Sequence, residues 1–299
     1  MPANIDKALE QGLRLQQDKD DRDNSVLHVS DLAHTIPGEG CPRQLWLRLH
    51  GYKRHKLTAG KLLMFDHGKQ IHKRLVEITK PILEQRGEWG YLEVEYPMAF
   101  DGVIGTCDCI LLHHATDNTI VQDFKSQRGN AFREDRLALL PKPGHVIQVQ
   151  GYIYGLKDDP LFQNLRVKEP SAGALLYVDR EGQNAAIEKP VERNDARVRE
   201  AIMELKDIAA NSMPPILEPI IKEQKKTKTK GIPLKARMPW VCDYCDYLDI
   251  SCDGALRKEH RLSGIVGHRV DDKFIPKDGI PAGIYATVSE LIEGTYIPF

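Results

Sequence analysis

The chain has 299 residues, of which 41% are hydrophobic and 28% are charged. This composition is typical of a globular protein with a sizeable core, in one large domain or two small ones. The formal net charge of −1 excludes a histone-like protein that coats nucleic acid, although an enzyme needs only a local basic groove. No apolar run approaches the roughly 18 residues of a membrane span, and the polar segment Met1–Asn24 lacks the apolar core of a signal peptide. We therefore expect a cytoplasmic protein with reduced thiols and no membrane partner.

Hydrophobic periodicity predicts an α/β core. After a polar N-terminal extension over residues 1–27, Ser30-Asp31-Leu32 has the pattern of a helix start with a capping side chain. Pro81 is expected to break or kink the helix that precedes it. Helices are predicted over 59–80, 144–156 and 195–210, and strands over 91–100, 103–112, 120–124, 172–178 and 185–191. This order favours a mixed central sheet flanked by helices.

The segment 211–240 differs from the core in composition. It contains five prolines, and its second half is strongly basic, so we expect a basic loop that leads into a cysteine cluster. Residues 257–299 carry glycines between short apolar runs, for which we expect a hairpin appendage without an assigned role.

Two acidic residues and a lysine carry the chemistry of the predicted sheet. Asp108 lies on one strand and Asp123 on the next, so an antiparallel pair brings both carboxylates to one patch. Asp123 and Lys125 project from the same face, while Phe124 points into the core. Two carboxylates, with the backbone carbonyl of Phe124 as a third oxygen, suit Mg²⁺ or Mn²⁺. Lys125 would then orient or deprotonate a metal-bound water for phosphodiester hydrolysis. The alternative is an Asp-x-Lys on a solvated strand, but a buried carboxylate without a partner cation is costly.

Four cysteines form a second constellation. Cys41 stands near the start of the chain, and Cys242, Cys245 and Cys252 cluster far downstream in a polar, aspartate-rich segment. Four thiolates can hold Zn²⁺ or a [4Fe–4S] cluster, and the spacing alone does not separate the two. Either centre would tie the N-terminal segment to the C-terminal one. The other two cysteines, at 107 and 109, fit ordinary buried thiols on a strand.

Basic and aromatic residues near the cysteines are candidates for DNA contact. The lysines could follow a phosphate backbone, and the aromatic rings could stack on unpaired bases. The alternative is a solvated linker with packed aromatics. The basic candidates are Arg43, Lys225, Lys226, Lys228 and Lys230, and the aromatic ones are Trp46, Tyr244 and Tyr247.

The ordered motifs resemble those of one nuclease family. They are Gly68-Lys-Gln-Ile-His72, Gly105 before Asp108, Asp123-Phe-Lys125, Gln148-x3-Tyr152, and the lone Cys41-Pro-Arg with its C-terminal trio. Together they resemble the PD-(D/E)XK nuclease superfamily, in particular the RecB-like branch with the CRISPR-associated four-cysteine exonucleases and their phage relatives. The resemblance spans roughly residues 28–256, which we expect to form one nuclease domain.

The resemblance implies roles for these residues. The fold would be a restriction-endonuclease-like core with a mixed sheet, closed by a [4Fe–4S] cluster rather than zinc. His72 would join Asp108 and Asp123 on the Mg²⁺ or Mn²⁺ ion. Gln148 and Tyr152 would support Lys125 and contact DNA; Gln150 and Tyr154 fit the same pattern two residues later.

The resemblance also implies exonuclease action on DNA ends, with a preference for single strands. Recombination, repair, phage DNA processing and CRISPR adaptation are compatible settings, with helicase or recombination proteins as partners. Two alternatives stay open: a non-catalytic nucleic-acid-binding subunit with the same fold, and a zinc-stabilised interaction protein.

Overall fold

The computed structural model describes residues 8–9, 11–15, 23–138, 140–181, 186–215, 220–223, 232–237, 245–247, 250–252, 265–270 and 273–276. The chain divides into two compact units. The first comprises Met1–Ile36 and Leu57–Ala210, and the second comprises Pro37–Lys56 and Asn211–Phe299. Among the described residues, no helix is both long enough and apolar enough to cross a membrane.

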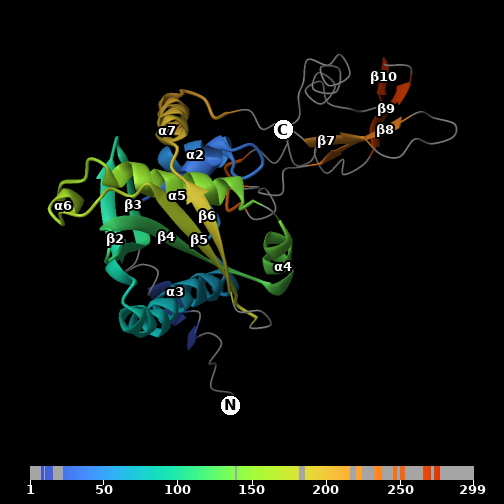
Figure 1. Ribbon diagram of the computed structural model, residues 1–299. Helices are drawn as coiled ribbons and strands as arrows, with labels where there is room; N and C mark the ends of the chain where they lie inside the picture. Colours follow the sequence, from blue (N-terminus) through green and yellow to red (C-terminus); the bar gives the residue numbers. More distant parts are fainter. Residues whose placement is uncertain are drawn as a thin grey trace. The chain divides into compact units, whose positions relative to one another are not determined.

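A six-stranded mixed sheet forms the centre of the first unit (Figure 1). β3 pairs with β2 and β4 in antiparallel fashion and with β1 in parallel fashion, β4 and β5 are parallel, and β5 and β6 are antiparallel. The predicted mixed α/β architecture is therefore confirmed. The strands are β1 (Leu27–His28), β2 (Trp89–Phe100), β3 (Val103–His113), β4 (Asn118–Gln127), β5 (Ala172–Asp179) and β6 (Ala186–Glu192).

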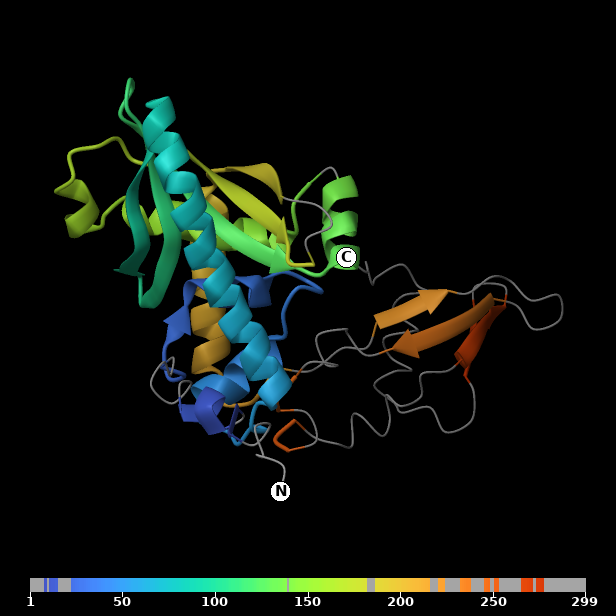
Figure 2. The same ribbon diagram turned by 90° about the horizontal axis from the view of Figure 1, so that it is seen from below.

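Helices cover both faces of this sheet. α3 (Ala59–Arg86) crosses one face, where it packs on β2 and β4. α5 (Pro143–Leu156) packs on the strands of the other face, together with α7 (Asp195–Ala210) and the 3₁₀ helix η1 (Val29–Thr35). Figures 1 and 2 show α3 on the side opposite to α5 and α7. Two shorter helices, α4 (Gly129–Leu137) and α6 (Pro160–Gln163), were not predicted.

The ends of α3 follow local signals. The hydroxyl of Thr58 accepts a hydrogen bond from the N–H of Lys61 at 3.3 Å, and Gly87 ends the helix in the left-handed region at φ 69°. The helix continues through Pro81, so the expected break is wrong. Pro81 has no N–H, so one carbonyl group of the preceding turn loses its helical hydrogen bond. Pro81 lies on the exposed side of the helix, where water can bind that carbonyl group.

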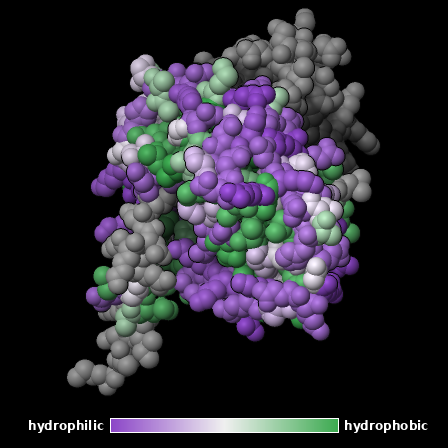
Figure 3. Space-filling model, turned by 60° about the vertical axis from the view of Figure 1, so that its left-hand side comes forward, coloured by the Kyte–Doolittle hydropathy of each residue, from purple (hydrophilic) through white to green (hydrophobic). Residues whose placement is uncertain are grey.

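One face of the sheet carries an apolar core beneath α3. Cys109, Leu111 and Phe124 are buried together and pack against Leu75 and Val76 of the helix. The alternation along β4 thus places Phe124 in the core and turns its two neighbours to the other side. Figure 3 shows a face of the molecule on which hydrophobic residues gather in several patches among hydrophilic ones, one of them near the centre.

The second unit joins residues from both ends of the chain. α2 (Pro42–Leu49) packs there, and Trp46 Nε1 donates a hydrogen bond to the carbonyl of Asn211 at 2.8 Å. The N–H of His55 donates to the carbonyl of Asp246 at 2.7 Å. These bonds link the segment around Cys41 to the C-terminal part of the chain.

A four-stranded antiparallel sheet belongs to the same unit, in the order β10-β9-β8-β7. β7 and β8 lie in the segment expected to be a loop, so that prediction is wrong for these residues. Its prolines suggested chain breaks, yet Pro233 is accommodated in β8 opposite His268. The candidate DNA-binding lysines 225, 226, 228 and 230 lie outside the described residues. The strands are β7 (Ile220–Glu223), β8 (Ile232–Arg237), β9 (Ile265–Val270) and β10 (Lys273–Pro276).

The aromatic candidates for base stacking are packed inside the second unit. Trp46 is 4% exposed and stacks on His50, with ring centroids 4.0 Å apart. Tyr247 is also 4% exposed. Both rings are packed, which favours the alternative of packed aromatics for these two residues, while Tyr244 lies outside the described residues.

Candidate active site

The two predicted acids lie where β3 and β4 separate. The last paired residues of these strands are Cys109 and Gln122, and the next positions in register are Asp108 and Asp123. Beyond that point the N–H of Phe124 donates to Oδ2 of Asp108 at 2.6 Å, in place of a carbonyl of β3. The side chain of one strand therefore completes the backbone hydrogen bonding of the other, and both carboxylates occupy one position along the sheet.

Lys125 connects this position to α5. Its Nζ lies 2.7 Å from Oδ2 of Asp123 and donates to Oε1 of Gln148 at 2.9 Å. Nε2 of Gln148 in turn donates to the hydroxyl of Tyr152 at 2.9 Å. Residues on one turn of a helix thus hold the lysine of the strand in place.

The alternative pair on α5 has other partners. Gln150 is buried and donates to the carbonyl of Glu192 at 2.8 Å. The hydroxyl of Tyr154 donates to Asp101 at 2.9 Å. The structure therefore brings Gln148 and Tyr152 to Lys125, while Gln150 and Tyr154 contact different elements.

His72 reaches the site from α3. Its Nδ1 lies 3.4 Å from Oδ1 of Asp108, and its ring packs edge-on against Phe124 at a centroid distance of 5.5 Å. Burial lowers the pKa of His72, but the hydrogen bond and the charge of Asp108 outweigh it, so that the pKa is raised overall. His67, one turn earlier, is exposed.

Asp123 is the most buried acid of the site, with 2% of its surface exposed. Burial raises its pKa, the ammonium group of Lys125 lowers it, and the neighbouring carboxylate of Asp108 raises it again, with a net upward shift. Within the described residues, Oδ2 of Asp123 has no well-aligned hydrogen bond, although Lys125 is close. A carboxylate in this setting is stabilised by additional positive charge.

The donor set fits a hard divalent cation. Among the described residues, no three His, Cys, Asp or Glu side chains already form a group that could hold a metal. Mg²⁺ does not require such a group, because it is commonly bound through one or two carboxylates and keeps several waters. Asp108 and Asp123 would be those carboxylates, and their ligation of a metal, like that by His72 and by the carbonyl of Phe124, stays a prediction.

Three of the four predicted cluster cysteines lie in the described part of the second unit. Cys41 and Cys252 are buried, Cys245 is half-buried, and Cys242 lies outside the described residues. Burial raises the pKa of the Cys41 thiol, hydrogen bonds from the backbone N–H groups of Gln44 and Arg43 oppose this, and nearby Cys252 adds to it. Two buried thiols within electrostatic reach fit part of a thiolate centre.

Arg43, the remaining DNA-contact candidate, is half-buried in the second unit. Its Nη1 donates to the carbonyl of Pro215 at 3.2 Å, which ties α2 to the segment after α7. This contact gives Arg43 a structural partner, and its binding of DNA stays a prediction.

Sequence reasoning missed the surroundings of Gln148 and Tyr152. These two side chains line a cavity together with Ser30 and Thr106, which come from other elements. The position of Thr106, two residues before Asp108 on the same strand, was the available signal, because such residues share a face. Nothing in the local sequence around Ser30 indicates its approach to α5.

The sequence matches one family model, that of the PD-(D/E)XK nuclease superfamily, over residues 8–252. No match is found among curated proteins. Solved structures show weak likeness. The protein SSO0001 is 16% identical with a TM-score of 0.45, covering 84% of this chain and 96% of that one. The alkaline exonuclease of Laribacter hongkongensis is 14% identical with a TM-score of 0.38, covering 62% and 87%. A phage-related exonuclease from Haemophilus somnus is 13% identical with a TM-score of 0.37, covering 62% and 93%.

The family assignment rests on the family model, which spans well over half of the chain and extends across both strands of the acidic hairpin, α5 and all four of the predicted cluster cysteines. The recognition of the motifs is confirmed, and the chain belongs to the PD-(D/E)XK nuclease superfamily.

Proposed function

We propose that this protein is a divalent-cation-dependent deoxyribonuclease that removes nucleotides from DNA ends, with a preference for single strands. The observation that supports this most is the position of Lys125, whose Nζ lies 2.7 Å from Asp123 and 2.9 Å from Gln148, beside the carboxylate of Asp108. Membership in a nuclease superfamily supports cleavage of nucleic acid.

The side chains of the site have distinct tasks in this proposal. Asp108 and Asp123 would hold Mg²⁺ or Mn²⁺, with His72 and the carbonyl of Phe124 as further ligands. When bound, the cation lowers the pKa of water and neutralises charge on the phosphate. Lys125 would orient the attacking water through its Nζ or, as the free amine, take the proton of that water, a role that typically contributes ~10²–10⁴-fold to the rate.

Gln148 and Tyr152 act as positioning residues. Oε1 of Gln148 accepts a hydrogen bond from the Lys125 ammonium group, and the hydroxyl of Tyr152 fixes the orientation of the amide. This chain of hydrogen bonds limits the lysine to one rotamer beside the acids. Such preorganisation avoids reordering of the site during the reaction.

We also propose that Cys41, Cys242, Cys245 and Cys252 hold a [4Fe–4S] cluster that fastens the two ends of the chain together. The burial of Cys41 and Cys252 and the hydrogen bonds between residues 37–56 and the C-terminal segment support a structural role. Recombination, repair, phage DNA processing or CRISPR adaptation in the cytoplasm are the proposed settings, with helicase or recombination proteins as partners.

Digestion of end-labelled DNA tests the proposed activity. The wild-type protein should release nucleotides from linear DNA with Mg²⁺ or Mn²⁺, should do so faster from single strands, and should leave covalently closed circles intact. Asp123→Asn should abolish release, while Asp117→Asn, in the exposed turn of the same hairpin, should retain it. Equal digestion by wild type and Asp123→Asn would refute the site, and cleavage of closed circles would refute exonuclease action.

A further inference from the structure

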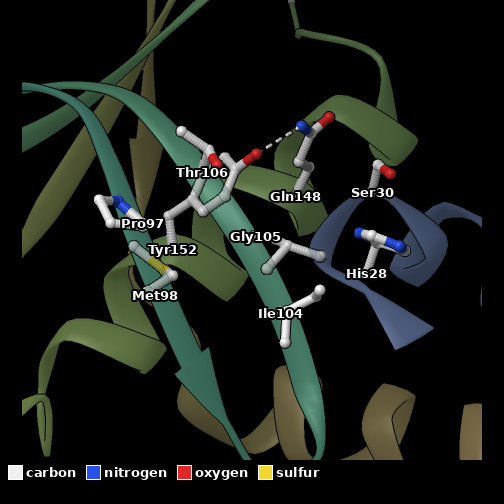
Figure 4. A pocket seen from close by; sticks show the side chains of 10 residues that line it. His28, Ser30, Pro97, Met98, Ile104, Gly105, Thr106, Gln148 and Tyr152 are labelled. Atoms are coloured by element: carbon white, nitrogen blue, oxygen red, sulfur yellow. Dashed lines mark hydrogen bonds between the residues drawn. The ribbon is translucent and has the colours of Figure 1, made fainter. Parts of the chain in front are cut away.

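A cavity of about 590 Å³ opens beside the residues that hold Lys125 (Figure 4). Gln148 and Tyr152 of α5 form the wall that it shares with the candidate active site. The opposite sides come from the edge of η1 and from β2 and β3, and Figure 4 shows these elements around one space. This volume lies within the range of small-molecule sites and suits one nucleoside better than a base pair.

The cavity begins on β3 two residues before Asp108, the acid of the proposed active site. Thr106 and Ile104 line it, and they precede Asp108 by two and four residues on the same strand. These three residues share a face, and a strand rises by roughly 3.4 Å per residue, so that Thr106 lies about 7 Å from Asp108 along the strand. A nucleotide whose phosphate is held at Asp108 and Asp123 would therefore place its sugar and base in the cavity.

Among the described residues that line the cavity there is no Lys, Arg, Asp or Glu, and His28 is the one with an ionisable ring. Met98 and Ile104 supply apolar surface. Polar side-chain groups in this described lining are few: the hydroxyls of Ser30 and Thr106, the amide of Gln148 and the phenol of Tyr152, besides the imidazole of His28. Apolar walls with a few fixed hydrogen-bonding groups favour a flat, neutral ligand over a free phosphate.

Tyr152 has hydrogen-bonding capacity left for a ligand. Its hydroxyl oxygen accepts from Nε2 of Gln148. In the part of the chain that the structure describes, its own proton has no acceptor. This phenol is 5% exposed, so that a donor of this kind gains from an acceptor on a bound nucleoside.

Gly105 lets these elements approach each other. A Cβ atom at this position would lie 2.6 Å from Cγ2 of Val29 and 3.3 Å from Cε1 of Tyr152. Any side chain would therefore displace η1 or the ring of Tyr152. The absence of a side chain keeps the tyrosine close to β3 and gives the cavity its wall next to the acids.

We propose that this cavity binds the nucleoside of the nucleotide whose phosphate is attacked, with its base unpaired. The proposal rests on the proposed nuclease function and adds a substrate subsite to it. An unpaired base leaves the duplex or the strand end and packs against Met98 and Ile104, while its sugar and polar edge meet Thr106 and Tyr152. Pockets that receive single bases in this way combine apolar contact with a few hydrogen bonds.

Binding of small probes tests the subsite directly. Calorimetric or NMR titrations would compare thymidine 5′-phosphate with 2-deoxyribose 5-phosphate, both with Mg²⁺ and the full chain. The nucleotide should bind at least about tenfold more tightly, because only it carries a base. Equal affinity, or no binding of the nucleotide, would overturn the proposal.

Two substitutions localise the binding. Ile104→Trp fills the cavity from an exposed strand position and should weaken nucleotide binding at least about tenfold. Val94→Trp, at an exposed position of β2 that does not line the cavity, is the matched control and should bind as wild type does. Thr106→Val, which keeps the shape of the side chain, should weaken binding by a smaller factor. Unchanged affinity in Ile104→Trp would overturn the proposal.

DNA digestion separates this inference from the proposed function. Wild type should degrade a strand with a terminal abasic unit at least about tenfold more slowly than a normal strand, and Ile104→Trp should lose that difference. Active enzyme that does not distinguish the two strands would overturn the subsite alone. If the protein bound thymidine 5′-phosphate in a base-dependent way but cut no DNA, the proposed subsite would stand and the proposed nuclease function would be refuted.

Discussion

The N–H of Phe124 donates a hydrogen bond to the carboxylate of Asp108 at 2.6 Å. This bond joins β4 to β3 at the point where their backbone pairing has ended. Asp108 thus has two tasks: it satisfies a backbone donor with one oxygen and faces His72 with the other, at 3.4 Å. The acid is therefore anchored at the strand position that follows the last paired residues, as Asp123 is on β4, which suits the proposed sharing of one cation.

Lys125→Ala should abolish DNA cleavage while leaving the fold intact. Lys125 lies beside Asp123 and Gln148, and the rate should fall by ~10²–10⁴-fold when its proton-transfer group is removed. Single-turnover cleavage and fluorescence anisotropy would measure rate and DNA affinity separately. Lys80→Ala, at an exposed position of α3, is the control. If Lys125→Ala cleaved DNA at the rate of the control, Lys125 would have no role in the mechanism.

Tyr152→Phe should lower kcat by about tenfold with little change in stability, because it deletes the hydroxyl that orients Gln148. The role is positional, so Gln148→Ala and Tyr152→Phe should not be additive in a double mutant. Tyr154→Phe is the matched control on the same helix, since its hydroxyl contacts Asp101 away from Lys125. Additive losses in the double mutant would show that the two residues act independently.

Gly173→Ala should destabilise the first unit by ~1–3 kcal/mol, as measured by denaturant unfolding. A Cβ at this position of β5 would lie 2.5 Å from Cγ1 of Val149 and 2.9 Å from the carbonyl oxygen of Val121. The backbone atom cannot move without distorting β4. Gly60→Ala, in the first turn of α3 with no atom closer than 4.0 Å, should instead stabilise the protein by about 0.5–1 kcal/mol. If Gly173→Ala left the free energy of unfolding unchanged, α5 and the sheet would be packed less closely at this position than the distances from Gly173 indicate.

His145 should make stability depend on pH below neutrality. Burial, with the charges of Lys125 and Lys142 acting in the same direction, lowers the pKa of His145 to about 3. The unfolded chain therefore takes up this proton first, so that stability is full above about pH 6.5 and falls as the pH decreases toward 3, by up to about 1.4 kcal/mol per pH unit. His145→Gln should flatten that part of the curve, while His67→Gln, on the exposed side of α3, should not. An unchanged slope in His145→Gln would contradict the depressed pKa.

Much of the first unit could be predicted because its signals are local. Alternation along β4 placed Phe124 in the core and Asp123 with Lys125 on the other face. Helical periodicity predicted the helix over 195–210, which is α7, and Oδ1 of Asn194 accepts a hydrogen bond from the N–H of Arg197 at 3.1 Å where that helix begins. The end of β3–β4 pairing could not be predicted, because it depends on a side chain replacing a backbone acceptor.

The second unit and the cavity were harder to predict, because both depend on contacts between distant segments. Residues 37–56 contact the C-terminal part through hydrogen bonds of Trp46 and His55. The sequence around these two residues does not indicate which distant residues they bind. β7 and β8 were obscured by prolines and lysines, which usually indicate a loop. The cavity required η1, β2, β3 and α5 to be in place before its lining could be recognised.

The most direct test of the account is the position of a bound cation. Crystals grown with Mn²⁺ should give an anomalous difference peak within bonding distance of a carboxylate oxygen from Asp108 and one from Asp123, and Asp108→Asn crystals should lose or weaken it. A peak that touches only one of the two acids in the wild type, or no peak at this position, would contradict the shared cation on which the proposed cleavage depends.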